Sequence, residues 1–267
     1  MTKGSHHSTL DLGGLRVDFL DGGSLAFTYE RPGKRLALEL AVRPVLVRSA
    51  TWSCLIDPGF GPADPRRRER FALRDPEPLE DQCRRLGLVD GPDHVLLTHL
   101  HFDHAAGVLA GSVCDPSRSA ELRFARAQHH VHSVEWEAAL REGRGGDLAL
   151  RMERALAGLP TFLPDRGVVF GEAAGPRVEV ELAPGHTEGL VAVWLRGARA
   201  TALYAADLVP TARFLEPRVD RMADQDPELA LATRTDLLRR SAVEGAYVLF
   251  YHDTDRTFAR LGQRSDD

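Results

Sequence analysis

The segment 94-HVLLTHLHFDHAAG-107 constrains the fold more than any other part of the chain. An apolar run leads directly into His99, His101, Asp103 and His104, in a sequence of 267 residues that holds only 11 histidines. Residues at a spacing of two, such as His99 and His101, project to the same side of an extended chain. Imidazole and carboxylate groups are ligands of Zn²⁺ and similar ions. The segment therefore predicts a strand that ends in one wall of a metal site, with a histidine-rich surface turn as the alternative.

Three further ligand-type residues stand at the ends of predicted strands. His186 lies in the Gly/Pro turn 183-APGHTEG-189, Asp207 ends the strand 201–207, and His252 comes near the end of 246-AYVLFYHD-253. Loops at strand ends carry binding and catalytic residues. Because four ligand-type residues in one tight turn exceed what a single tetrahedral ion takes from it, we expect the seven residues to hold two ions.

Apolar periodicity predicts runs of strands interrupted by helices, with a similar run in each half of the chain. The strongest helix signal is 227–245, where Asp226 is the expected N-cap, Pro227 the first helical residue and Gly245 the stop. The other predicted helices are 77–87, 134–142 and 147–158. The other predicted strands are 15–20, 24–29, 43–49, 52–57, 94–98, 121–127, 177–183 and 190–196. This order predicts one domain at 13–265 after a flexible tail at 1–12, with two packed sheets and helices outside.

Composition excludes several classes of protein. No apolar run approaches the roughly 18–20 residues of a membrane span, and the first 12 residues lack the apolar core of a signal peptide. Cys54, Cys83 and Cys114 contain no Cys-x-x-Cys pair, which argues against a disulfide framework or a zinc ribbon and fits a cytoplasmic protein. The net charge of −5 disfavours a nucleic-acid binder, and we expect the basic cluster 66-RRRER-70 to be a solvated loop or helix start.

His-x-His-x-Asp-His, followed by an isolated His, an Asp and a final His, resembles the metallo-β-lactamase superfamily over nearly the whole chain. The string HLHFDHA and the pattern from 205-AADLVPT-211 to 252-HD-253 are most similar to its N-acyl homoserine lactonase-like branch. The resemblance implies an α+β fold, a four-layer αβ/βα sandwich in which two mixed sheets pack face to face with helices outside.

The resemblance also implies roles for individual residues. One ion would be held by three histidines and a second by three other ligands, with Asp207 bridging the two ions. The first set is His99, His101 and His186, and the second is Asp103, His104 and His252. Asp57 would brace the histidine-rich turn. Apart from the resemblance, we expect Asp103 to carry a proton during catalysis, because a carboxylate beside a metal can be both ligand and proton carrier, and Phe102, which lies inside the motif, to form a pocket wall. The ions would be zinc first, with manganese, iron or cobalt as alternatives.

The predicted function is that of a binuclear-metal hydrolase, in which a metal-bridged hydroxide attacks the carbonyl of an ester, lactone or similar acyl compound. The alternatives are a glyoxalase II-like thioester hydrolase and a one-iron oxygenase of the same fold. Pro210 stands where the lactonases usually carry a Tyr that contacts the substrate, which weakens the lactone prediction. The expected partner is a small-molecule substrate, with no nucleic acid and no membrane, and a homodimer is left open.

The run 128-QHHVHS-133 offers a second group of histidines. His130 and His132 share a strand face, but the helix predicted after them matches no ligand pattern. We expect a strand end or a pocket rim there rather than a third metal site. Strand alternation likewise predicts that Tyr204 is a core residue and that Tyr251 points away from His252.

Overall fold

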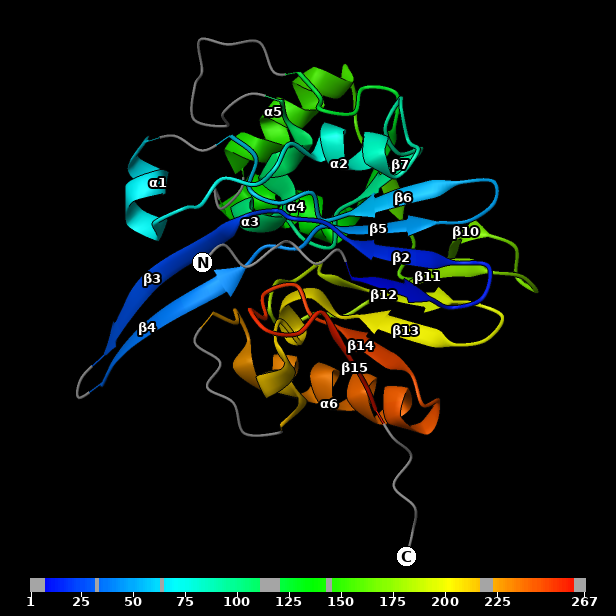
Figure 1. The fold of residues 1–267 in the computed structure, drawn as a ribbon. Helices are drawn as coiled ribbons and strands as arrows, with labels where there is room; N and C mark the ends of the chain where they lie inside the picture. The colour runs from blue at the N-terminus through cyan, green and yellow to red at the C-terminus, as the bar shows by residue number, and fades with distance from the viewer. Residues whose placement is uncertain are drawn as a thin grey trace, which may run out of the picture.

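Two β-sheets lie face to face, with helices on both outer faces, in the computed structural model of the protein (Figure 1). The structure describes residues 8–31, 34–62, 65–110, 121–142, 146–216 and 223–261. His6 and His7 of the predicted tail, and Cys114, lie outside these residues.

The first sheet contains seven strands in the order β1-β2-β5-β6-β7-β8-β9. The strands are β1 (Thr9–Asp11), β2 (Arg16–Phe19), β5 (Val45–Arg48), β6 (Ser53–Ile56), β7 (His94–Leu96), β8 (Gln128–His132) and β9 (Thr161–Leu163). Pairing is antiparallel from β1 to β6 and parallel from β6 to β9. The carboxyl ends of β6 and β7 therefore lie at the same edge.

The second sheet contains six strands in the order β10-β11-β12-β13-β14-β15. The strands are β10 (Arg166–Gly171), β11 (Arg177–Leu182), β12 (Val191–Arg196), β13 (Thr201–Tyr204), β14 (Tyr247–Leu249) and β15 (Phe258–Arg260). All neighbours are antiparallel except β13 and β14, which run parallel and end at the same edge. Both sheets are thus mixed, as predicted.

Helices complete the layers. Most helices pack on the first sheet, and one packs on the second (Figure 1). On the first sheet lie α2 (Leu79–Arg85), α4 (Ser133–Glu142) and α5 (Gly146–Leu156), and on the second lies α6 (Pro227–Val243). Asp226 caps α6 as predicted, since its Oδ1 accepts a hydrogen bond of 3.0 Å from the backbone N–H of Leu229.

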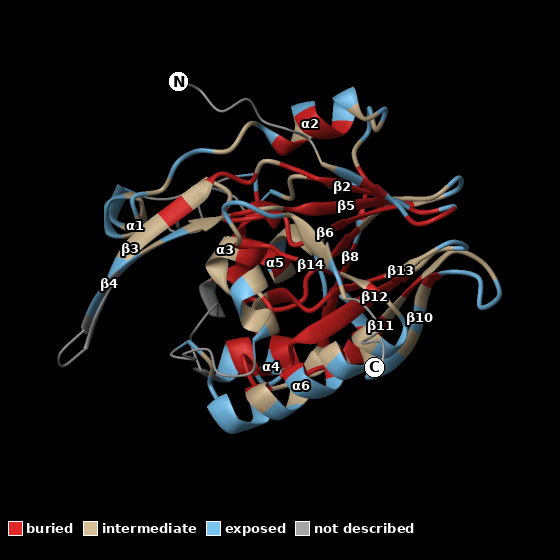
Figure 2. Cartoon of the chain, turned by 60° about the horizontal axis from the view of Figure 1, so that its bottom comes forward, coloured by how far each residue is buried: buried red, intermediate tan, exposed pale blue. Residues whose placement is uncertain are grey.

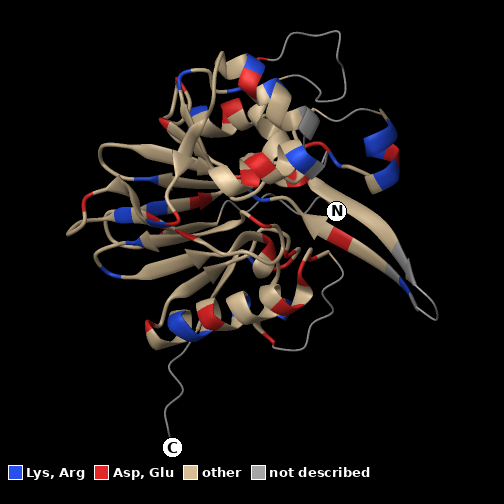
Figure 3. Ribbon diagram, turned by 180° about the vertical axis from the view of Figure 1, so that it is seen from behind, with Lys and Arg blue, Asp and Glu red and all other residues tan. Residues whose placement is uncertain are grey.

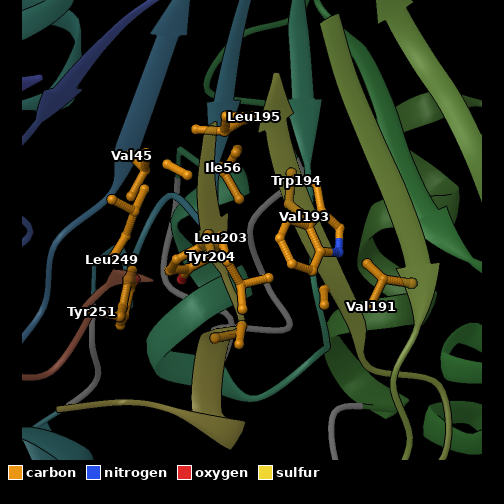
Figure 4. Close-up of a cluster of buried hydrophobic side chains, with 14 of the residues drawn as sticks. Val45, Ile56, Val191, Val193, Trp194, Leu195, Leu203, Tyr204, Leu249 and Tyr251 are labelled. Carbon is orange, nitrogen blue, oxygen red and sulfur yellow. The ribbon is translucent and has the colours of Figure 1, made fainter. Parts of the chain in front are cut away.

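Apolar side chains from both sheets fill the space between them. Val45 and Ile56 of the first sheet meet Val193 and Leu203 of the second sheet in Figure 4. Figure 2 shows the central strands of both sheets as mainly buried and the outer side of α6 as exposed. This pattern confirms the predicted four-layer sandwich, because only a sheet covered on both faces is apolar on both faces.

A third, two-stranded sheet projects from the body of the molecule (Figure 1). It consists of β3 (Ser24–Arg31) and β4 (Lys34–Ala41), and α1 (Pro65–Phe71) lies beside it. The predicted basic cluster falls in α1, which carries both charge signs in Figure 3. Arg68 of this helix pairs with Asp75, so the cluster is partly neutralised.

Three predictions about elements are wrong. Residues 9–12 are not a flexible tail, because β1 pairs with β2 and Leu12 is fully buried. Residues 121–127 form turns apart from one isolated bridge at Leu122, and the strand begins at Gln128. The predicted last strand is followed by β15, which pairs with β14 but, at three residues, is too short to show a strand pattern in the sequence. Within the described residues, no helix is long and apolar enough to cross a membrane.

Candidate metal centre

All seven predicted ligand residues follow strands whose ends meet at one edge of the sandwich. The histidine-rich turn follows β7, His186 follows β11, Asp207 follows β13 and His252 follows β14. The turn itself becomes a short helix, α3 (Phe102–Ala105), which presents Asp103 and His104. Parallel pairing of β13 with β14 brings Asp207 and His252 together although they lie 45 positions apart along the chain.

Three histidine nitrogens converge on a first point. Nδ1 of His101 lies 3.2 Å from Nε2 of His99 and 3.0 Å from Nε2 of His186. Ligands that bind one ion tetrahedrally through bonds of about 2.0–2.1 Å lie about 3.3 Å from one another. The three nitrogens are therefore within a few tenths of an ångström of the spacing that one ion requires.

A second group forms beside the first. Nε2 of His104 lies 3.1 Å from Nε2 of His252, and the latter lies 3.5 Å from Oδ2 of Asp103. These three residues form a group whose ligand atoms all lie within 4.8 Å of one another. The two predicted ligand sets thus correspond to two neighbouring clusters of donor atoms, and His99 also forms a third group with Asp57 and His104.

Asp207 stands between the two groups and turns one carboxylate oxygen to each. Its Oδ2 lies 3.2 Å from Nε2 of His186, and its Oδ1 lies 3.0 Å from Nε2 of His104 and 3.3 Å from Nε2 of His252. The backbone reaches this position through Ala206, which has a φ of +45°, a left-handed conformation that costs about 1–3 kcal/mol at a residue other than glycine.

Four of the five imidazoles are anchored through the ring nitrogen that faces away from the cluster. Nδ1 of His252 donates to the carbonyl of Ala41 at 2.7 Å, and the other three anchoring contacts involve side chains. These are His99 to Thr98 Oγ1 (3.1 Å), His104 to Asp57 Oδ2 (2.9 Å) and His186 to Asp224 Oδ1 (3.0 Å). Such partners fix the tautomer and leave Nε2 free to bind a metal.

Asp57 is fully buried and connects the histidine-rich turn to the second sheet. Its Oδ1 accepts from the backbone N–H of Thr98 at 2.8 Å, and its Oδ2 accepts from the Thr98 hydroxyl at 2.6 Å, from His104, and from the Tyr204 hydroxyl at 2.8 Å. Tyr204 is a buried core residue, as predicted, but its hydroxyl also supports the site. The geometry fits the bracing role that the resemblance implies for Asp57.

Tyr251 contacts the cluster, contrary to the prediction. Its ring stacks on that of His104 with 4.1 Å between centroids, and its hydroxyl donates to the carbonyl of Asp103 at 2.8 Å. The alternation rule failed because β14 ends at Leu249, so the backbone at Tyr251 is no longer extended strand.

Burial and charge divide the histidines into two kinds. Burial lowers the pKa of His99, and burial together with His186 lowers the pKa of His101 to about 4, so both imidazoles are neutral near pH 7. Burial opposes the charged forms of His104 and His186 as well, but the Asp207 carboxylate outweighs it. The pKa of His104 is raised, and that of His186 is raised to about 9.

The donor set fits divalent cations. Oδ1 of Asp207 is buried and has no hydrogen-bond partner of acceptable geometry among the described residues, although two imidazoles lie close to it. Five imidazoles and two carboxylates within a few ångströms form the nitrogen and oxygen set that zinc, manganese, iron and cobalt accept. The cluster could therefore hold divalent metal ions on either side of Asp207.

Two residues near the cluster were not identified from the sequence. Asp224 anchors His186 from the segment before α6, and a lone aspartate 38 positions from its partner carries no local signal. Glu135, in the first turn of α4, bonds to both the histidine-rich turn and the His186 turn. Acidic residues are common in the first turn of a helix, so the position of Glu135 gave no indication of a role at the site.

Phe102 lies between two of the ligands and is half-buried. Its ring packs against that of Phe71 of α1 at 5.1 Å, and the guanidinium of Arg67 lies over it at 4.7 Å from the centroid. Its role as a pocket wall stays a prediction.

The histidines of β8 lie apart from this cluster. Nε2 of His130 lies 3.2 Å from Nδ1 of His94, and His132 pairs with Asp165. None of them belongs to a group with metal-ligand spacing in the described part of the chain. His129 is buried, and neither of its ring nitrogens has a hydrogen-bond partner among the described residues.

The β8 histidines predict a loss of stability in acid. Burial lowers the pKa values of His129 and His130 to about 4, below the ordinary value near 6.5. The folded chain favours the neutral imidazoles. Their contribution to the free energy of unfolding is therefore complete above pH 6.5 and is lost as the pH falls from 6.5 towards 4. We expect His129→Leu to flatten the decline of the free energy of unfolding, by at most about 1.4 kcal/mol per pH unit. Urea unfolding of the wild type and of His129→Leu at pH 7, 5.5 and 4.5 tests this prediction. An equal fall of the free energy of unfolding with pH in the two proteins would contradict it.

Comparison with known proteins agrees with this architecture. The model of the metallo-beta-lactamase superfamily matches residues 40–111, which include the histidine-rich turn. No curated protein matches the sequence. A probable metal-dependent hydrolase from Staphylococcus aureus is 19% identical, with a TM-score of 0.81 over 96% of this chain and 95% of that one.

Two lactonases have similar structures. AidC, a dizinc quorum-quenching lactonase, is 19% identical, with a TM-score of 0.74 over 97% of this chain and 95% of that one. AiiA of B. thuringiensis is 21% identical, with a TM-score of 0.66 over 92% and 95%. The similarities extend over nearly the whole chain and confirm the fold predicted from the sequence.

Proposed function

We propose that this chain, which has the metallo-β-lactamase fold, is a hydrolase that uses two divalent cations to cleave an ester, lactone or related acyl bond. The observation that carries the proposal is the position of Asp207, whose two oxygens face two separate groups of imidazoles. A site for one ion would need neither the second group nor a carboxylate between the groups, which disfavours the one-iron oxygenase.

The residues that would hold the ions follow from the two clusters. His99, His101 and His186 would hold one ion, Asp103, His104 and His252 the other, and Asp207 both. When bound, such ions supply Lewis acidity to a carbonyl oxygen and lower the pKa of water, so that a nucleophile is available near neutral pH. Zinc is the first choice of ion, by the donor set and by the dizinc centre named for AidC.

The chain itself would orient the ligands and move a proton. The side chains of Asp103 and Asp207 are each 15% exposed, whereas His104 and His252 are buried, so a substrate would meet the two carboxylates first. The Asp103 carboxylate would also take the proton from the attacking water and deliver it to the leaving oxygen. The hydrogen bond from Tyr251 to the Asp103 carbonyl holds the backbone of this residue in place.

The acyl substrate class rests on two supports. The nucleophile and proton carrier described above suit attack on a carbonyl, and two of the similar structures are lactonases. Pro210 lacks the hydroxyl that the lactonases offer to the substrate from this position, and its carbonyl accepts the backbone N–H of His252 at 2.9 Å. We therefore place simple esters beside lactones as substrates.

A metal-content measurement and a substrate panel test the proposal. Protein purified with added zinc is expected to contain two ions per chain and to hydrolyse a lactone or an aryl ester faster than a thioester, a β-lactam or a phosphodiester. Removal of the ions by a chelator is expected to abolish hydrolysis and lower the Tm, since an ion that binds only the folded state stabilises it. Restoring zinc should restore both.

One iron per chain together with oxygen consumption would contradict the proposal, and so would hydrolysis of only the phosphodiester. Preference for the thioester would favour the glyoxalase II-like alternative while leaving the two-ion site intact.

A further inference from the structure

The two turns that carry the first ligand group are joined through one buried side chain. The histidine-rich turn and the His186 turn come from different sheets, and the backbone N–H of Val191, the first residue of β12 after the second turn, donates to the Thr98 carbonyl at 3.0 Å. Between them lies the carboxylate of Glu135, which is 4% exposed and belongs to α4, outside both turns.

Each oxygen of Glu135 holds a different turn. Oε1 accepts from the backbone N–H of Leu100, the residue between His99 and His101, at 2.8 Å. Oε2 accepts from the hydroxyl of Thr187, the residue after His186, at 2.7 Å, and from the backbone N–H of Gly189 at 3.2 Å. The partners are three donors, which suits a carboxylate that spans the two turns.

Gly189 shows how closely α4 approaches the second turn. A Cβ at this position would lie 2.1 Å from the backbone nitrogen of Glu135, so only a glycine allows the contact. The close approach keeps the Glu135 carboxylate within reach of Leu100 and Thr187 together, which a longer separation would prevent.

We infer that Glu135 is a positioning residue that assembles the His99, His101 and His186 group by tying their two turns to α4. It touches none of the ligand atoms. The inference rests on the proposed metal site, but it concerns metal affinity rather than the reaction. Loss of a partner that orients ligands typically weakens metal binding by about 10–100-fold.

Two variants separate the effect of shape from that of charge. Glu135→Gln keeps the length but turns an NH₂ group towards one of the donors, whichever way the amide lies. Glu135→Asp keeps the charge but shortens the side chain, so that it reaches only one turn. If position matters, both variants weaken metal binding, whereas an effect of charge alone would spare Glu135→Asp. Glu137→Gln, an exposed position on the same helix, is the matched control.

The measurement is a Co²⁺ titration followed by the visible absorption of the bound ion, with chelator competition for the two dissociation constants. We expect both Glu135 variants to bind one Co²⁺ about 10–100-fold more weakly, with a changed absorption band, and the second ion much less affected. Glu137→Gln should match the wild type.

Unchanged affinity in Glu135→Gln would overturn the inference, and so would an equal loss at both ions, which would indicate general destabilisation. If the wild type bound no Co²⁺, the proposed metal site would itself fail. If the wild type bound two ions and the Glu135 variants bound both with normal affinity, only the inference about Glu135 would fail.

Discussion

Asp207→Ala is expected to abolish hydrolysis and to leave the protein with fewer than two ions per chain. Asp207 turns one carboxylate oxygen to each group, with 3.2 Å from Oδ2 to His186 Nε2 and 3.0 Å from Oδ1 to His104 Nε2. Its removal takes a ligand from each ion and a negative charge from between two cations. The loss of kcat/KM should therefore exceed the roughly 10–100-fold that loss of an outer hydrogen-bond partner costs.

The measurement combines elemental analysis with kinetics on whichever substrate of the panel is cleaved. Asp207→Asn, which keeps the volume, should behave like Asp207→Ala, because an amide offers only one oxygen. Asp255→Asn is the control, since this aspartate is exposed and follows His252 by three positions. Full activity with two ions in Asp207→Ala would show that the two-ion assignment is wrong.

Asp57→Asn is expected to lower both stability and metal affinity. Either orientation of the Asn amide sets its NH₂ group against an N–H donor, that of Thr98 or that of His104. A buried donor left without an acceptor costs about 1–3 kcal/mol, so the free energy of unfolding should fall by about that amount. His104 can relieve the conflict by moving its proton to Nε2, but that atom is the predicted ligand. We therefore also expect about 10–100-fold weaker binding of the second ion.

Urea unfolding with and without added zinc separates the two effects. Asp90→Asn, at a side chain that is 74% exposed, should leave the stability unchanged to within about 0.5 kcal/mol. If Asp57→Asn matched the wild type in both stability and metal content, Asp57 would be an ordinary turn aspartate.

The fold was predictable because its signals are local or follow from a resemblance. Strands such as β12 and β13 are short apolar runs, and α6 carries its cap and its proline at the expected positions. The prediction failed where pairing depends on distant residues. Thr9–Asp11 is a strand only because β2 offers it an edge, and residues 121–127 form no strand although their alternation favours one.

The ligand residues were likewise visible in the sequence, because metal-binding chemistry needs particular side chains. Few imidazole and carboxylate groups follow apolar strands, so the number of candidate ligands is small. The motif from His99 to His104 contains four of them. The residues that orient these ligands were mostly invisible. Tyr251 and Asp224 act through a hydroxyl and a carboxylate that reach the cluster from distant segments, and no short spacing records such contacts.

The sequence by itself determined which groups can bind metal and at which strand ends they stand, since residue chemistry and strand periodicity are local properties. The resemblance already implied a bridging position for Asp207 and a bracing role for Asp57, but only the tertiary structure showed the contacts that place them and the part that Glu135 takes. Those facts depend on parallel pairing of β6 with β7 and of β13 with β14, and on the stacking of the two sheets. A contact across 54 positions, such as that of Glu135 with Gly189, exists only after the chain has folded.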